Sequence, residues 1–77
     1  PELPDLLFTW GVALYRSGRV LEAKEKISAA LAQDPDRLDI NLALAQVHTS
    51  LGELDQAIAI HERVLVSAKS LRPRQPT

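Results

Sequence analysis

The sequence has no cysteine and no methionine, and it contains one tryptophan, one tyrosine and one phenylalanine. The lack of cysteine excludes disulfides, thiolate catalysis and cysteine-ligated zinc. Nine basic and ten acidic residues give a net charge of −1, so a basic surface for nucleic acid or for an anionic membrane is not expected. Apolar runs are far shorter than a membrane span, and no signal segment opens the chain. We therefore expect a soluble protein that binds neither nucleic acid nor membranes, in an undecided compartment with the cytoplasm slightly favoured.

The chain has 77 residues, which is the size of one small domain, here residues 1–77. A domain of this size buries only about 60 per cent of the surface of its unfolded chain, so its core is marginal. The sequence begins Pro-Glu-Leu-Pro and lacks methionine, which leads us to expect an excised fragment or a processed product. Neighbouring segments would then hold part of the function.

The most informative feature of the sequence is that the stretch 10–35 recurs in weakened form. Gly18 recurs as Gly52 and Ala23 recurs as Ala57, and each pair is separated by 34 positions. This period is typical of a helix–turn–helix unit that cannot bury its apolar face alone and therefore stacks on a neighbour. The sequence thus predicts two stacked repeats.

The residues at the repeated positions resemble those of a known family. The first unit carries Trp10, Gly11, Leu14, Gly18, Ala23, Ile27, Ala30 and Pro35. The second unit carries Leu44, Ala45, His48, Gly52, Ala57, His61 and Val64 at the same spacings. This pattern is similar to the tetratricopeptide repeat (TPR) and covers residues 4 to about 71. Histidines replace two aromatic positions of the second unit, and Lys69 replaces its closing proline. The resemblance implies an all-α fold, an α-solenoid segment of two TPR hairpins with four antiparallel helices, and a protein-binding scaffold.

We expect a first repeat over about 4–37, a second over about 38–71, and a tail over 72–77. The predicted helices run from Pro4 to about Ser17, from Val20 to Gln33, from about Arg37 to Leu51, and from Leu54 to Leu71. On the first helix, Leu7, Trp10, Gly11 and Leu14 have the spacing of one buried stripe. Gly18 and Gly52 are expected to end helices in the left-handed conformation, and Asp36 to cap the third helix.

The resemblance also implies a binding groove, because partner peptides of TPR proteins lie against the first helix of each repeat. The matching positions here are Phe8, Val12, Tyr15, Arg16, Leu42, Gln46 and Thr49. Some members grip an acidic C-terminal tail with Lys and Asn, but Phe8 and Val12 occupy those two positions. We therefore expect a mainly apolar groove suited to an amphipathic helix or an extended apolar peptide. The alternative is that Phe8 and Tyr15 merely pack against a preceding element or a second copy.

A second functional reading is self-association. Repeat arrays usually need about three units and a polar terminal helix, and this chain has two units without such a helix. The last helix is therefore expected to expose an apolar edge formed by Ile60, His61, Val64, Ala68 and Leu71. A second copy, a further repeat or a partner helix would cover it, and in the first case the protein would be a homo-oligomer.

The two histidines are the residues that most invite a catalytic or metal-binding reading. His48 and His61 fall on facing helices of one repeat, so they are candidates for neighbours. A metal site would need a third ligand, and no Cys, Asp or Glu is well placed for it. The sequence also contains no phosphate-binding loop and no nucleophile motif. We therefore expect no enzymatic activity, no metal and no cofactor, with ordinary or pH-sensitive histidines as the remaining readings.

Overall fold

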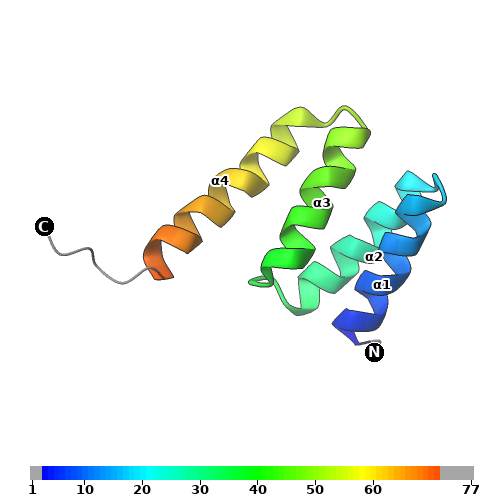
Figure 1. The fold of residues 1–77 in the computed structure, drawn as a ribbon, viewed down its shortest axis with the longest axis horizontal. Helices are drawn as coiled ribbons and strands as arrows, with labels where there is room; N and C mark the ends of the chain where they lie inside the picture. Colours follow the sequence, from blue (N-terminus) through cyan, green and yellow to red (C-terminus); the bar gives the residue numbers. More distant parts are fainter. Residues whose placement is uncertain (1–2, 72–77) are drawn as a thin grey trace, which may run out of the picture.

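In the computed structural model the chain forms four α-helices joined by short turns (Figure 1). The structure describes residues 3–71, and the side chains of residues 3–67. The helices are α1 (Pro4–Arg16), α2 (Val20–Gln33), α3 (Leu38–Ser50) and α4 (Leu54–Leu71). Each predicted boundary agrees with the structure to within one residue, and residues 3–71 contain no strand, so the all-α prediction is confirmed. The predicted tail, 72–77, lies outside the described residues.

Successive helices pack side by side and run in opposite directions (Figure 1). α2 lies between α1 and α3, α4 packs against α3, and α1 also contacts α3. The main core forms where these helices meet. Its buried members are Leu7, Leu14, Ala23, Ile27, Ala30, Ile40, Leu44, Ala45, Val47 and Ile60. Most of the core therefore comes from the first three helices.

The two glycine turns close the helix pairs in the same way. Gly18 and Gly52 have φ angles of 85° and 78°, in the region that favours glycine. At the first turn the Arg19 amide donates to the carbonyl of Leu14 at 2.9 Å, and the corresponding bond at the second turn is 2.8 Å long. These bonds satisfy carbonyl groups that the helix ends leave free. The prediction that Gly18 and Gly52 end α1 and α3 is confirmed.

Two local predictions were wrong. Trp10 is 44% exposed instead of buried, and the Nζ atom of Lys26 lies 3.9 Å from the centre of its ring. Asp36 does not cap α3, because the residue at the cap position is Arg37, which makes no side-chain capping bond. Asp36 lies inside the turn closed by the bond from the Arg37 amide to the carbonyl of Asp34, so the chain enters the helix after it.

Candidate functional site

A shallow hollow lies between α1 and α3, the first helices of the two repeats. Its volume is about 190 Å³. It is lined by Val12, Tyr15, Arg16, Ile27, Ala43, Gln46 and Val47. The apolar members come from all three helices of the main core, and the polar ends of Tyr15, Arg16 and Gln46 provide hydrogen-bonding groups. The hollow is thus an apolar depression with a small number of polar groups.

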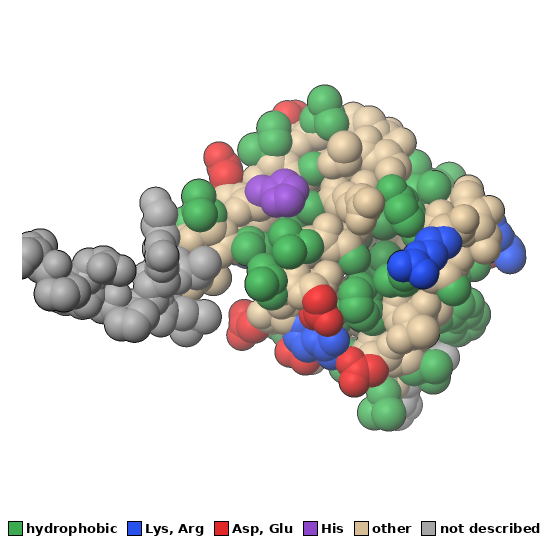
Figure 2. Space-filling view, viewed as in Figure 1, with side chains coloured by type: hydrophobic (Ala, Val, Ile, Leu, Met, Phe, Trp, Pro, Cys, Tyr) green, Lys and Arg blue, Asp and Glu red, His purple; other side chains and the backbone are tan. Residues whose placement is uncertain are grey.

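Polar contacts join the α1 and α3 regions at both ends of this pair of helices. At one end the hydroxyl groups of Tyr15 and Ser50 hydrogen-bond at 2.6 Å. At the other end the Arg37 guanidinium donates to Asp5 near the start of α1 and, through two nitrogens, to Asp39 in the first turn of α3. Figure 2 shows charged side chains of both signs gathered below an apolar region at this end. The spacing of α1 and α3 is therefore held by side-chain contacts as well as by the core.

The charges around Arg37 reinforce one another. Hydrogen bonds from Arg37 hold the pKa of Asp39 below its usual value. Hydrogen bonds to Asp39 and then to Asp5 raise the pKa of Arg37 in turn. Both partners of this contact are thus charged at neutral pH, and the contact persists across the physiological range.

The structure brings four of the predicted groove residues together in the hollow: Val12, Tyr15, Arg16 and Gln46. Phe8 lines a second hollow of about 540 Å³ on the surface of α1, together with Thr9, Val12, Ala13 and Arg16. Leu42 is exposed on α3 and lines neither hollow. The Thr49 hydroxyl donates back to the carbonyl of Ala45 at 2.9 Å, so it is occupied within its own helix.

The predicted apolar edge of α4 differs from the structure. Ile60 is only 7% exposed and belongs to the core, so its assignment to the exposed edge was wrong. His61 is exposed and Val64 is partly buried against the core. The side chains of Ala68 and Leu71 lie outside the described residues. Among the described side chains of α4 beyond its first residue, the large apolar ones that are exposed are those of Ile58, Leu65 and Val66.

The two histidines do not form a pair. His48 Nδ1 lies 2.7 Å from Glu53 Oε1, and the Lys24 Nζ atom donates to the same carboxylate at 3.1 Å. His61 is exposed on α4. The hydrogen bond from His48, followed by the one from Lys24, lowers the pKa of Glu53. Among the described residues no three His, Cys, Asp or Glu side chains are grouped as metal ligands.

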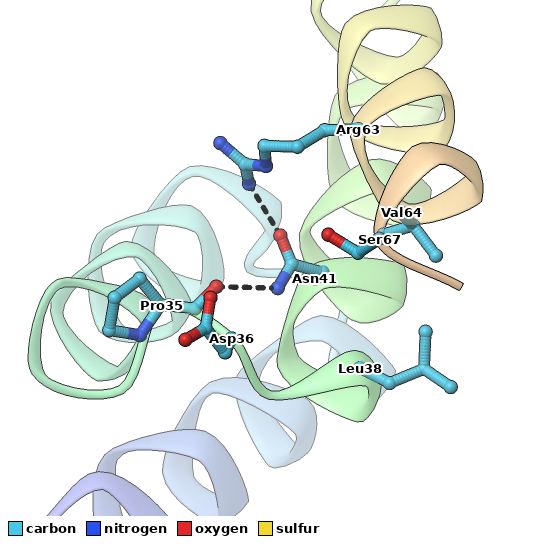
Figure 3. A pocket seen from close by; sticks show the side chains of 7 residues that line it. All are labelled: Pro35, Asp36, Leu38, Asn41, Arg63, Val64 and Ser67. Carbon is cyan, nitrogen blue, oxygen red and sulfur yellow. Dashed lines mark hydrogen bonds between the residues drawn. The ribbon is translucent and has the colours of Figure 1, made fainter. Parts of the chain in front are cut away.

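A third hollow, which the sequence did not predict, lies between α3 and α4 (Figure 3). Its volume is about 260 Å³, and it is lined by Pro35, Asp36, Leu38, Asn41, Arg63, Val64 and Ser67. Asn41 is buried, donates to the carbonyls of Pro35 and Arg37 at 3.0 and 2.7 Å, and accepts from Arg63. The repeat spacing could have indicated that Asn41 is buried, because Asn41 stands 34 positions after Leu7, a core residue of the first repeat.

Comparison with known families bears directly on these surfaces. The family model described as tetratricopeptide repeat matches residues 14–70, which is most of the chain. The chain belongs to the tetratricopeptide repeat family. TPR domains are in general protein–protein interaction modules and are typically non-catalytic, and their partners are other proteins. A search of curated proteins found no match to the sequence, and a search of solved structures found none.

In this TPR domain the hollow between α1 and α3 lies on the helices that begin the two repeats. None of the helices within residues 3–71 has both the length and the apolar character needed to cross a membrane. The surfaces that a partner can reach include the three hollows described above and the exposed apolar side chains of α1 and α4.

Proposed function

We propose that this TPR domain binds an apolar or amphipathic segment of a partner protein in the hollow between α1 and α3. The observation that carries the proposal is the apolar lining between two helices joined at both ends. Val12, Ala43 and Val47 supply the apolar surface, while Arg16 and Gln46 supply polar groups at its side. Binding sites commonly combine an apolar depression with a few polar groups that orient the ligand.

The contacts that join the two helices support this proposal. The Tyr15 and Ser50 hydroxyls at one end, and Arg37 with its two carboxylates at the other, restrain the relative movement of α1 and α3. A surface that is already held in shape loses less conformational freedom when it binds, so more of the interaction energy appears as affinity. The hollow is therefore suited to a short segment that anchors one apolar side chain.

The charge at this surface favours a particular chemistry of partner. Phe8 and Val12 are apolar, and Arg16 is the basic residue of the hollow. A strongly acidic tail would find one cation and apolar neighbours, which is a poor match. An amphipathic segment fits better, because its apolar face covers Val12 while a carboxylate or carbonyl group accepts from Arg16 or Gln46.

Selection from a library of random peptides displayed on phage tests the proposal. We expect enriched peptides to share apolar residues and to shift the amide NMR signals of residues on α1 and α3. Val12→Lys, which places a charge in the hollow, should abolish binding, whereas Leu21→Lys, at an exposed position of α2, should not. Enrichment of no peptide, or shifts confined to α2 and α4, would refute groove binding.

Self-association is the second candidate function, and exposed apolar side chains of α4 favour it. Ile58 and Leu65 are both more than half exposed, although they lie in the middle of a long helix. Residues seven positions apart lie on one face of a helix, and a contiguous apolar patch on such a face would mark an interaction surface. Sedimentation over a wide concentration range distinguishes an associating chain from a monomer.

A further inference from the structure

The two repeats can be compared position by position, and their exposure differs in a systematic way. On α3, Ile40, Leu44 and Val47 are 0%, 6% and 1% exposed. Their counterparts on α1, 34 positions earlier, are Leu6, Trp10 and Ala13. Leu6 is 55% exposed, Trp10 is 44% exposed and Ala13 is exposed.

This difference has a simple structural cause. α2 packs against α3 and covers its apolar positions, whereas no helix within residues 3–71 covers the matching side of α1. The residues of α1 are themselves apolar, so the uncovered side has the character of a helix-packing surface. We call this surface, formed by Leu6, Thr9, Trp10 and Ala13, the α1 edge.

The hollows show the same relationship. The hollow of about 540 Å³ on α1 includes Thr9 and Ala13 of the α1 edge. Their counterparts Ala43 and Val47 line the smaller hollow of about 190 Å³, where Ile27 of α2 also contributes. A helix packed on the α1 edge as α2 packs on α3 would fill the larger hollow in the same way.

The chain itself carries a helix of the required kind. Three residues of α2 lie toward the second repeat: Lys24, Ile27 and Leu31. Lys24 reaches Glu53, Ile27 lines the hollow with residues of α3, and Leu31 packs on the core. Their counterparts on α4, again 34 positions later, are Ile58, His61 and Leu65, and all three are exposed. We call these three residues the α4 edge.

We propose that the α4 edge of one copy packs on the α1 edge of a second copy, in the arrangement that α2 adopts on α3 within one chain. This proposal builds on self-association, the second candidate function, and adds the receiving surface and its direction. It borders on the proposed peptide site, since Val12 and Arg16 line both hollows, but it is tested separately because its variants, at Leu6 and Leu65, change neither residue.

The chemistry of the two edges is compatible with this contact. Neither edge contains Asp, Glu, Lys or Arg, but the Lys26 Nζ atom lies 3.9 Å from the centre of the Trp10 ring, so Lys26 must stay at the solvent-exposed rim of the contact when Trp10 is covered. The two surfaces are different, which makes the contact head-to-tail. Contacts of this type do not close after two copies unless the rotation forms a ring, so assembly continues beyond a dimer.

Sedimentation equilibrium combined with fluorescence of Trp10, the one tryptophan of the chain, tests the proposal. We expect the mass of the wild-type chain to rise with concentration above 8.5 kDa and past the dimer, with a blue shift of the Trp10 emission as water is excluded from its ring. Leu6→Glu alters the α1 edge and Leu65→Glu alters the α4 edge. Each variant alone should be monomeric, because burying an unpaired carboxylate weakens association by at least about tenfold.

Mixing the two variants gives the decisive result. Leu6→Glu keeps an intact α4 edge and Leu65→Glu keeps an intact α1 edge, so a one-to-one mixture should form dimers and nothing larger. Leu21→Glu is the matched control, because Leu21 is exposed and its counterpart, Asp55, is exposed too. This control should associate like the wild type, and circular dichroism should show equal helix content in all four proteins.

His61 offers a test in the opposite direction. Its counterpart in the first repeat is Ile27, which is buried between α2 and its neighbours. His61→Ile therefore copies the first repeat on an exposed position and should tighten association several-fold. A weaker association of this variant would contradict the proposed packing.

Four other outcomes would overturn the proposal. Association of Leu65→Glu alone would mean that two α1 edges pair, and association of Leu6→Glu alone would mean that two α4 edges pair; self-association would then survive without the head-to-tail contact. A mixture that stays monomeric while the wild type associates would place the contact elsewhere. A wild-type chain that remains monomeric at millimolar concentration would refute self-association and leave peptide binding to its own test.

Discussion

Gly11 of α1 lies so close to Ile27 of α2 that a Cβ atom on Gly11 would come within 2.5 Å of Ile27 Cγ1. The same atom would lie 3.3 Å from the carbonyl oxygen of Ala23. In the second repeat the two matching positions hold Ala45, which is buried, and His61, which is exposed. The first hairpin therefore has the closer contact at this level, and Figure 1 shows α4 diverging from α3 toward its C-terminal end.

Gly11→Ala should lower the free energy of unfolding by about 1–2 kcal/mol. Overpacking of a core typically lowers the free energy of unfolding by about 1–3 kcal/mol. Replacing a glycine inside a helix by alanine raises it by up to about 1 kcal/mol, which offsets part of that loss. Urea unfolding followed by circular dichroism measures the difference.

The double variant Gly11→Ala with Ile27→Ala is the control for this contact. Ile27→Ala removes the side-chain atoms that the new Cβ would meet. The loss of unfolding free energy in the double variant should therefore be smaller than the sum of the losses in the two single variants. A Gly11→Ala variant that is more stable than the wild type would show that α1 and α2 separate easily, contrary to the packing described.

Asn41→Ala should lower the free energy of unfolding by about 1–3 kcal/mol. Asn41 is buried, and its amide bonds to the carbonyls of Pro35 and Arg37, so the change removes these hydrogen bonds and leaves a gap beside Val64. Thermal and urea unfolding both report the loss.

Two further variants separate the causes at this position. Arg63→Ala removes one bond from an exposed side chain and should cost less than Asn41→Ala. Asn41→Leu copies Leu7 of the first repeat and should recover part of the loss by filling the hollow between α3 and α4. Equal stability of Asn41→Ala and the wild type would mean that the hydrogen bonds of the Asn41 side-chain amide do not stabilise the fold.

Glu53 should make the stability of the domain depend on pH in the acid range. His48 and Lys24 lower the pKa of Glu53 in the folded state. The stabilisation from a lowered carboxyl pKa is fully present above the unfolded value, about 4.3, and it is lost as the pH falls through the folded value. The wild type should therefore lose stability below about pH 4.3 faster than Glu53→Gln does.

The urea concentrations at the unfolding midpoints of the two proteins, measured from about pH 3 to pH 7, test this effect. The pKa of Glu in an unfolded chain, about 4.3, lies within that range. The difference between them should shrink as the pH falls below about 4.3. Asp39 also has a lowered pKa and contributes to the acid response of both proteins, so the comparison depends on the difference between the curves. Parallel curves over the whole range would contradict a role for the Glu53 contacts.

Trp10 and Leu44 show where prediction from the repeat pattern succeeds and where it fails. Both occupy the same position of the repeat and the same place on a first helix, and the pattern predicts both as core residues. Leu44 is 6% exposed and Trp10 is 44% exposed, because α2 lies against α3 while the matching side of α1 is open. Periodicity identifies an apolar stripe, but the neighbour that covers it lies elsewhere in space.

Ile60 and His61 illustrate the same point on α4. This helix has two apolar stripes, and periodicity alone does not say which one faces α3. The structure buries Ala57 and Ile60 and exposes Ile58, His61 and Leu65. Rotating α4 about its axis by one residue would bury the other stripe instead, and the packing against α3 determines which stripe is buried.

The residues that line the hollow between α1 and α3 were partly predictable. The resemblance to the TPR family placed Val12, Tyr15, Arg16 and Gln46 near one another, and they line one hollow in the structure. The joining contacts of Arg37 and Ser50 were not predicted, because they link side chains more than thirty positions apart. Such contacts depend on the separation of α1 and α3, which no local pattern specifies.

The sequence by itself determined the four helices, their glycine turns and the two-repeat arrangement, because these depend on hydrogen bonds and periodicities within a few residues. The tertiary structure decided which apolar stripe of each helix is buried, where Asn41 finds its partners and which edges of α1 and α4 remain open. The physical reason is that burial depends on which helices come together in space, and two stripes with the same sequence pattern differ only in whether another helix lies against them.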